Sequence, residues 1–229
     1  MDPLIIIPAR GNSKGLPGKN VKPLAGKPLI LYTLEAAREV FPVDRICVST
    51  DSSETAEVVA SSGYKVPFMR PAHLATDTAS TRDVILHAIN YYRKIGTLVS
   101  DVVLLQPTSP LRNAAHIRDA LKLYSSKDCD MIVSVKEASA NPYFTLFEED
   151  DRGLLRKSKP SVASRRQDVP SVWEYNGAIY IFSVDLIFER QISEFERIRK
   201  FVMDEYSSVD IDSDLDWVIA EYIVKNKKD

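Results

Sequence analysis

Cysteine, histidine and net charge are all scarce in this chain of 229 residues, and each shortage excludes a class of protein. The two cysteines, Cys47 and Cys129, lie beside apolar runs, which favours buried reduced thiols over a disulfide. The three histidines are scattered, so neither a zinc site nor a Ser-His-Asp triad can be assembled from the sequence. A formal net charge of −2 provides no basic field that would recruit nucleic acid, so any anionic ligand must be held by local cations.

Long apolar runs are missing as well. No stretch approaches the ~20 apolar residues that a membrane span requires, and we recognise no signal peptide. We therefore expect no membrane association and a cytoplasmic location. A length of 229 residues suits one large α/β domain, or one such domain with an appendage.

A glycine-rich, cationic loop directly follows the first apolar run. Residues 4–8 have the character of a buried strand, and the loop RGNSKGLPGKN occupies residues 10–20. Backbone N–H groups in such a loop cradle phosphate oxygens while the Lys and Arg side chains neutralise their charge, so we predict a polyphosphate site. The glycine spacing matches neither the Walker loop nor the dinucleotide fingerprint. A solvated surface turn is the alternative.

Strand and helix signals alternate through most of the chain. The pattern predicts strands at residues 4–8, 45–49, 65–69, 101–106 and 131–136, with helices at 28–41, 53–62, 80–94 and 114–125. A strand at 176–182, a short edge strand at 201–203 and a helix at 213–225 follow. Repeated βα units predict an α/β fold with a doubly wound, mostly parallel (Rossmann-like) sheet and ligands at the carboxyl ends of its strands.

Residues 137–173 interrupt this alternation. The segment TLFEEDDRGLLRKS predicts a hairpin, because Leu146 and Phe147 can face Leu154 and Leu155 across an acidic turn. An arm of this size cannot hold a core of its own, so it must lie on the main domain or on another subunit. We predict a single domain over residues 1–229 in which 137–173 form a dimerisation arm. A flap that closes over the chain's own site is the alternative.

Four aspartates occupy alternate positions near the end of the chain, from Asp210 to Asp216. In an extended segment Asp210 and Asp212 share a face and could hold Mg²⁺ through oxygen ligands. Helix capping explains these acids equally well, since Ser213 and Asp216 resemble a capping box. We assign Asp214 and Asp216 to capping and solvent.

Two further segments carry groups that suit an acidic, hydroxylated ligand. Gln106, Thr108 and Ser109 lie in a turn stiffened by two prolines, which reduces the entropy lost on binding. Arg165 and Arg166 stand together, and a planar guanidinium can bind a carboxylate or phosphate through two hydrogen bonds. The alternatives are an ordinary loop with a helix cap and a solvated basic pair.

Five segments, in order along the chain, resemble the nonulosonic-acid cytidylyltransferases, the CMP-sialic acid synthetase family. They are the loop at 10–20, RPAHLATDTAST at 70–81, LLQPTSPLR at 104–112, NGAIYIF at 176–182 and DIDSDLD at 210–216. The resemblance implies that CMP passes from CTP to the anomeric hydroxyl of a nonulosonic acid, N-acetylneuraminate or a close relative, with release of pyrophosphate. It also implies a homodimer that forms through the inserted arm.

The resemblance assigns roles to individual residues of this sequence. The residues that would bind CTP are Ala9, Arg10, Gly11, Ser13, Lys19, Asn20, Arg70, Ala79 and Thr81. Those that would bind the acid sugar are Gln106, Thr108, Ser109, Arg166 and Asn176. Asp210 and Asp212 would hold Mg²⁺, and the catalytic residues would be Arg10, Lys19 and Asp212.

Two positions depart from the family. Some relatives have an arginine just before the asparagine-glycine pair and a lysine near position 144, where this chain has Glu174-Tyr175 and Phe144. These departures affect how the carboxylate of the acceptor is recognised. One alternative function is a cytidylyltransferase for another keto-deoxy acid sugar of legionaminic, pseudaminic or eight-carbon type. The other is a non-catalytic nucleotide-binding regulatory module.

Overall fold

The protein is built around one six-stranded mixed sheet. The computed structural model describes residues 3–12, 15–125 and 128–226. In spatial order the strands are β10 (Ile198–Val202), β6 (Met131–Glu137), β9 (Trp173–Ser183), β5 (Asp101–Leu104), β1 (Pro3–Pro8) and β4 (Ile46–Ser49). β9 runs antiparallel to both β5 and β6, and the other neighbours in the sheet are parallel. The predicted doubly wound, mostly parallel α/β class is confirmed.

Helices cover both faces of the sheet. They are α1 (Leu29–Arg38), α2 (Ser53–Ser61), α3 (Thr81–Lys94), α4 (Ala114–Tyr124), α5 (Val184–Glu189) and α6 (Asp214–Asn226). In β1, Leu4 and Ile6 pack with α3 and α5, whereas Ile5 and Ile7 pack with α1, α2 and α4. All four side chains are fully buried, as expected for a strand covered on both faces. None of the helices in the described ranges is both long and apolar enough to cross a bilayer.

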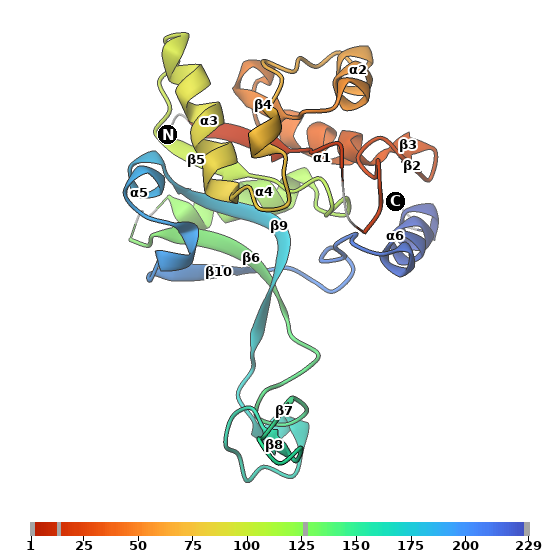
Figure 1. Ribbon diagram of the computed structural model, residues 1–229, viewed down its shortest axis with the longest axis vertical. Coiled ribbons are helices and arrows are strands. Elements are labelled where there is room, and N and C mark those ends of the chain that lie inside the picture. Colours follow the sequence, from red (N-terminus) through yellow and green to blue (C-terminus); the bar gives the residue numbers. More distant parts are fainter. Residues whose placement is uncertain (1–2, 13–14, 126–127, 227–229) are drawn as a thin grey trace.

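The last helix packs against the start of the chain. α6 lies beside the short β2 (Pro23–Leu24) and β3 (Lys27–Pro28) ribbon (Figure 1). A small separate core forms there, and its buried members include Leu16, Ile211 and Trp217. Lys22 lies over the ring of Trp217, with its ammonium 4.4 Å from the ring centroid. This core holds the glycine-rich loop and the aspartate segment together.

Residues 138–172 form an arm that projects from the ends of β6 and β9 (Figure 1). Near its tip, β7 (Phe147–Glu149) and β8 (Leu155–Lys157) pair as a hairpin across a turn that contains Gly153. Leu155 is 69% exposed and Phe147 is 47% exposed. The arm therefore presents apolar side chains that its own chain does not cover.

One expected strand is missing, and one helix was not expected. Residues 65–69 form no strand, and the segment touches the sheet through a single bridge between Thr50 and Met69. Pro67 has no N–H to donate and Met69 is half exposed, so this segment cannot extend the buried sheet. The sequence pattern did not predict the short α5, because this helix has only six residues, although Ser183 caps its first turn.

Candidate active site

A cavity of about 590 Å³ opens at the carboxyl ends of β1 and β5. Six of the predicted CTP ligands lie on its wall, together with Gln106, Thr108 and Asp212. These six residues are Arg10, Lys19, Asn20, Arg70, Ala79 and Thr81. Three cations therefore surround a space at the strand ends, where open α/β sheets bind their ligands.

Hydrogen bonds to backbone groups of the glycine-rich loop hold it in place. The side-chain amide of Asn20 donates to the carbonyl of Arg10 at 3.0 Å, and the N–H of Gly11 donates to Asp51 at 2.9 Å. The amide oxygen of Asn20 is buried and has no hydrogen-bond partner within the described residues, which leaves it available to a ligand. Ala9 is fully buried and its N–H donates to Ser49, so its part in the site is made by its backbone. Ser13 lies outside the described residues.

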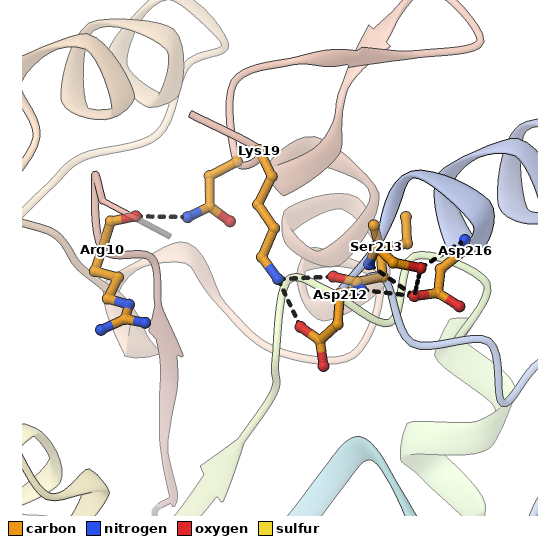
Figure 2. A network of polar contacts seen from close by, with 7 residues as sticks. Arg10, Lys19, Asp212, Ser213 and Asp216 are labelled. Atoms are coloured by element: carbon orange, nitrogen blue, oxygen red, sulfur yellow. Dashed lines mark hydrogen bonds and ion pairs between the residues drawn. The ribbon is translucent and has the colours of Figure 1, made fainter. Parts of the chain in front are cut away.

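Lys19 joins this loop to the aspartate segment. Its ammonium donates to the carbonyl of Ile211 at 2.7 Å and to the carboxylate of Asp212 at 2.9 Å. Figure 2 shows the side chain of Lys19 directed toward Asp212. The side chain of Lys19 is 9% exposed, whereas that of Asp212 is 78% exposed. The lysine is thus fixed at the base of the cavity, while the carboxylate faces the open space.

Arg10 forms an ion pair with Asp77 on the other side of the cavity, at 2.8 Å. Both side chains remain partly exposed, so the pair contributes little to folding stability. It fixes the direction of the Arg10 side chain across the cavity mouth. Sequence reasoning missed Asp77, and the one signal available was its place within the segment RPAHLATDTAST.

Asp210 has the character of a cation ligand. Burial raises the pKa of this carboxyl group, and the nearby Asp212 raises it further, while a hydrogen bond from Thr108 and the charge of Lys19 oppose the shift. One of its carboxylate oxygens is buried without a partner among the described residues. Burying such a group is costly unless a cation satisfies it.

Asp210 and Asp212 suit Mg²⁺ better than they suit a metal ion whose ligands are all protein side chains. Within the described residues, no group of three or more His, Cys, Asp and Glu side chains could hold a metal ion. Mg²⁺ commonly takes one or two carboxylates and completes its shell with water and substrate phosphates. Asp210 and Asp212 next to a cationic cavity match that donor set. Asp216 serves a different purpose, since its carboxylate accepts from the N–H and hydroxyl of Ser213 and caps α6.

The polar turn after β5 is supported by hydrogen bonds from residues that do not line the cavity. The carbonyl of Gln106 accepts from the guanidinium of Arg112 at 3.1 Å, and the carbonyl of Thr108 accepts from the N–H of Ile211 at 2.9 Å. Arg112 is almost fully buried, and burial lowers its pKa to about 9. Ser109 is also buried and donates to the carbonyl of Asn176. Gln106 and Thr108 face the cavity, whereas Ser109 and Arg112 support the turn.

Asn176 is occupied by internal contacts. Its amide oxygen accepts from Ser134 at 2.6 Å, and its amide nitrogen donates to Ser208 at 2.9 Å. These bonds hold the irregular stretch of β9 opposite Ser134, where the β6–β9 register shifts. The side-chain amide of Asn176 thus supports the site through internal hydrogen bonds, and its contact with the sugar stays a prediction.

Arg70, Ala79 and Thr81, three of the predicted CTP ligands, come from the segment that resembles the family at residues 70–81 and line the same cavity. Arg70 donates to the hydroxyl and carbonyl of Ser49 and to the carbonyl of Leu74 at 3.5 Å, so it also shapes the cavity wall. Thr81 is the first residue of α3, and its neighbour Ser80 caps that helix by accepting from Asp83 at 3.1 Å. Ser80, and not Thr81, is therefore the N-cap of α3.

Arg166 lies apart from these residues. It belongs to a short 3-10 helix in the arm (Arg166–Asp168), and its guanidinium donates to the carbonyl of Ala138 at 3.4 Å. It lines a different cavity, together with Glu137 and Asn141. Within a single chain the structure does not bring Arg166 to Lys19 and Asp212. Arg165, the preceding residue in the sequence, forms an ion pair with Asp168.

The comparisons with known proteins agree with the geometry of the site. The family model described as Cytidylyltransferase matches residues 4–226. The chain belongs to the cytidylyltransferase family. This cytidylyltransferase is 33% identical over 223 residues to the CMP-N,N'-diacetyllegionaminic acid synthase of Legionella pneumophila, a match that covers 97% of this chain and 96% of the relative.

Two further matches extend the comparison. The N-acylneuraminate cytidylyltransferase of Streptococcus agalactiae serotype V is 34% identical over 236 residues, which cover 100% of this chain and 56% of that protein. A solved structure of CMP:2-keto-3-deoxy-manno-octonic acid synthetase complexed with CTP superposes with a TM-score of 0.71 at 18% identity. That match covers 97% of this chain and 98% of the other, and it shows a shared fold. The family resemblance seen in the sequence is confirmed.

Proposed function

We propose that this cytidylyltransferase transfers CMP from CTP to the anomeric hydroxyl of a nonulosonic acid, either N-acetylneuraminate or a close relative. The observation that carries the proposal is the contact between Lys19 and Asp212 at 2.9 Å, on the wall of a cavity that three cations surround. A cationic loop and a carboxylate pair around one cavity are what a triphosphate and its metal require. The names of the relatives support a nonulosonic acid as the acceptor.

The reaction needs no nucleophilic side chain. The sugar hydroxyl oxygen bonds to the α-phosphorus, the bond to the bridging oxygen breaks, pyrophosphate leaves, and the hydroxyl proton passes to solvent. Catalysis then depends on positioning and on charge stabilisation. Arg10 and Lys19 would stabilise negative charge on the transferred and leaving phosphates. The free amide oxygen of Asn20 would orient the nucleotide.

Asp210 and Asp212 would hold Mg²⁺. When bound, this ion neutralises phosphate charge and makes the attacking hydroxyl more acidic. The partly buried Asp210 fixes the position of the site, while the exposed Asp212 can turn toward the nucleotide once Lys19 contacts phosphate. The remaining predicted CTP ligands, Arg70, Ala79 and Thr81, would surround the nucleoside.

We also propose a homodimer and a cytoplasmic site of action. The projecting arm carries exposed apolar side chains, and its predicted anion ligand Arg166 does not reach the cavity of its own chain. A second copy would cover the apolar side chains and could bring Arg166 to the acceptor. Sedimentation should give twice the mass of 25.7 kDa. A monomer at working concentration would favour the alternative, in which the arm is a flap.

Pyrophosphate release tests the main proposal. The purified protein would be supplied with Mg²⁺, each of the four nucleoside triphosphates, and a panel of acid sugars that includes sialic, legionaminic, pseudaminic and eight-carbon types. Release with CTP and one acid sugar, and not with CTP alone, is expected. Nucleotide binding without any release would instead support the regulatory module.

A further inference from the structure

A second cavity, of about 600 Å³, lies against the first and shares Asp212 with it. Asp210 and Asp216 also line it, together with Asn176 and Tyr175 from β9. Asp212 therefore stands between two spaces of similar volume, and Asp210 lies beside it on the wall of the second. An enzyme that joins a nucleotide to a sugar needs such an arrangement, with the reacting groups at the boundary.

The charged side chains that line this second cavity are mostly negative. Five carboxylates line it, those of Glu174, Glu205, Asp210, Asp212 and Asp216. Among the described residues on its wall, Lys136 is the one cation. An acidic ligand would be repelled by most of this wall, so a carboxylate that binds here must lie close to Lys136.

Lys136 is positioned by the irregular pairing of β6 with β9. It lies directly opposite Glu174, and the register shifts between Val133 and Val135 just before it. A bulge of this kind re-aims the side chains that follow it. The ammonium of Lys136 lies 3.7 Å from the carboxylate of Glu174, which is an ion pair but too long for a good hydrogen bond. Within the described residues no other partner of this ammonium is found, so its donors remain available.

We infer that the second cavity receives the acid sugar and that Lys136 binds its carboxylate. The inference rests on the proposed function and names the residue that binds the carboxylate of the acceptor sugar. The sequence left this residue open, because this chain has Glu174 and Phe144 where some relatives carry cations. The carboxylate of a nonulosonic acid is attached to the anomeric carbon, so it must lie near the reacting hydroxyl. Lys136 shares a cavity with Asp210 and Asp212, whereas Arg166 does not.

Part of the wall of this cavity is apolar and would face the sugar's substituents. It is formed by Val209, Ile219 and Ile223, together with the ring of Tyr206. The methyl group of an N-acyl substituent would leave water favourably against such a surface. Lys136 would thus select for the acid, and this wall would select among acyl substituents.

Substitution of Lys136 tests the inference through the Michaelis constants of the two substrates. Lys136→Met keeps the aliphatic stem and removes the charge, so the KM for N-acetylneuraminate, or for whichever acid sugar is turned over, should rise ~10-fold or more. The KM for CTP and the melting temperature should stay unchanged, and Lys136→Arg should recover part of the loss. Lys122→Met is the control, because it removes another ion-paired lysine, on α4 and outside both cavities.

The methyl ester of the acid sugar gives a second readout. Wild-type protein should bind the acid more tightly than the ester in an equilibrium titration, and Lys136→Met should lose that preference. If wild type turns over the acid sugar and Lys136→Met does so with unchanged KM, the inference is wrong and the proposed function stands. If no pyrophosphate is released but the acid binds through Lys136, the proposed function fails and the inference stands. Wild-type protein that binds no acid sugar would overturn the inference.

Discussion

Gly15 offers the sharpest test of how the site is assembled. A Cβ atom built on this residue would lie 2.1 Å from the carbonyl oxygen of Asp212. Ordinary contact begins at 3.4 Å, so Gly15→Ala must separate the loop from the aspartate segment by about 1.3 Å. The neighbouring group is backbone, which cannot rotate aside as a side chain would. The substitution therefore moves Lys19 relative to the carboxylates without removing any of the proposed catalytic groups.

A displacement of that size is large on the scale of catalysis. A shift of ~1 Å at a reacting group costs on the order of 100-fold in rate. We expect kcat of Gly15→Ala to fall by about that factor, measured as pyrophosphate release at saturating CTP and acid sugar. The melting temperature should drop by only a few degrees, because the residue lies at the edge of a small core rather than within the sheet.

Gly18→Ala is the matched control for this prediction. Gly18 has a φ of +67° and nothing within 4 Å of its added Cβ, so alanine there brings backbone strain of ~1 kcal/mol but no clash with the aspartate segment. It should lower stability with little loss of kcat. Wild-type turnover in Gly15→Ala would refute the reasoning, and so would an equal loss of kcat in both variants.

Three further substitutions test separate parts of the site. Lys19→Met should lower kcat by ~100-fold or more in the pyrophosphate assay, the usual cost of losing a charge partner in the transition state, while the sheet stays folded by circular dichroism. Asp210→Asn should abolish most turnover yet raise the melting temperature at neutral pH. The folded-state pKa of Asp210 is raised, so its charge opposes folding once the pH exceeds the unfolded carboxyl value, and the gain should vanish below about pH 4. A melting temperature that is lower than wild type at every pH would contradict this. Arg112→Met should leave the melting temperature within a few degrees of wild type, because a buried charge without a carboxylate partner adds little net stability, but should lower kcat ~10-fold by loosening the Gln106 turn. Full activity in this variant would exclude Arg112 as a support for the turn.

Periodicity and loop chemistry were sufficient to predict the sheet but not its edges. β1 and β5 were recognisable because strands buried on both faces are apolar without interruption. Residues 65–69 are also mostly apolar, but Pro67 and the exposure of Met69 separate them from a buried strand. The antiparallel direction of β9 could not be predicted either. Direction depends on where the arm returns the chain, and that is a long-range property which local pattern does not encode.

The site shows the same division between local and long-range information. Lys19, Asp210 and Asp212 could be predicted as site residues because cations in a glycine loop and alternate carboxylates are visible in the sequence. Arg112 and Lys136 were missed as individual residues, since an arginine after a turn and a lysine at a strand end look like ordinary surface residues. Their importance comes from burial in one case and from a shifted strand register in the other. Neither quantity can be obtained from a single sequence.

The contacts around Lys19 explain how residues 193 positions apart can act on one substrate. The aspartate segment has no strand of its own in the sheet. It is held by the N–H of Ile211 on the Thr108 carbonyl, by Lys19 on the Ile211 carbonyl, and by the close packing of Gly15 on Asp212. Each of these contacts involves a loop or turn that also lines the nucleotide cavity. A nucleotide that binds the loop as proposed would therefore also bear on the segment that carries the aspartates, so we expect nucleotide binding and metal binding to be coupled.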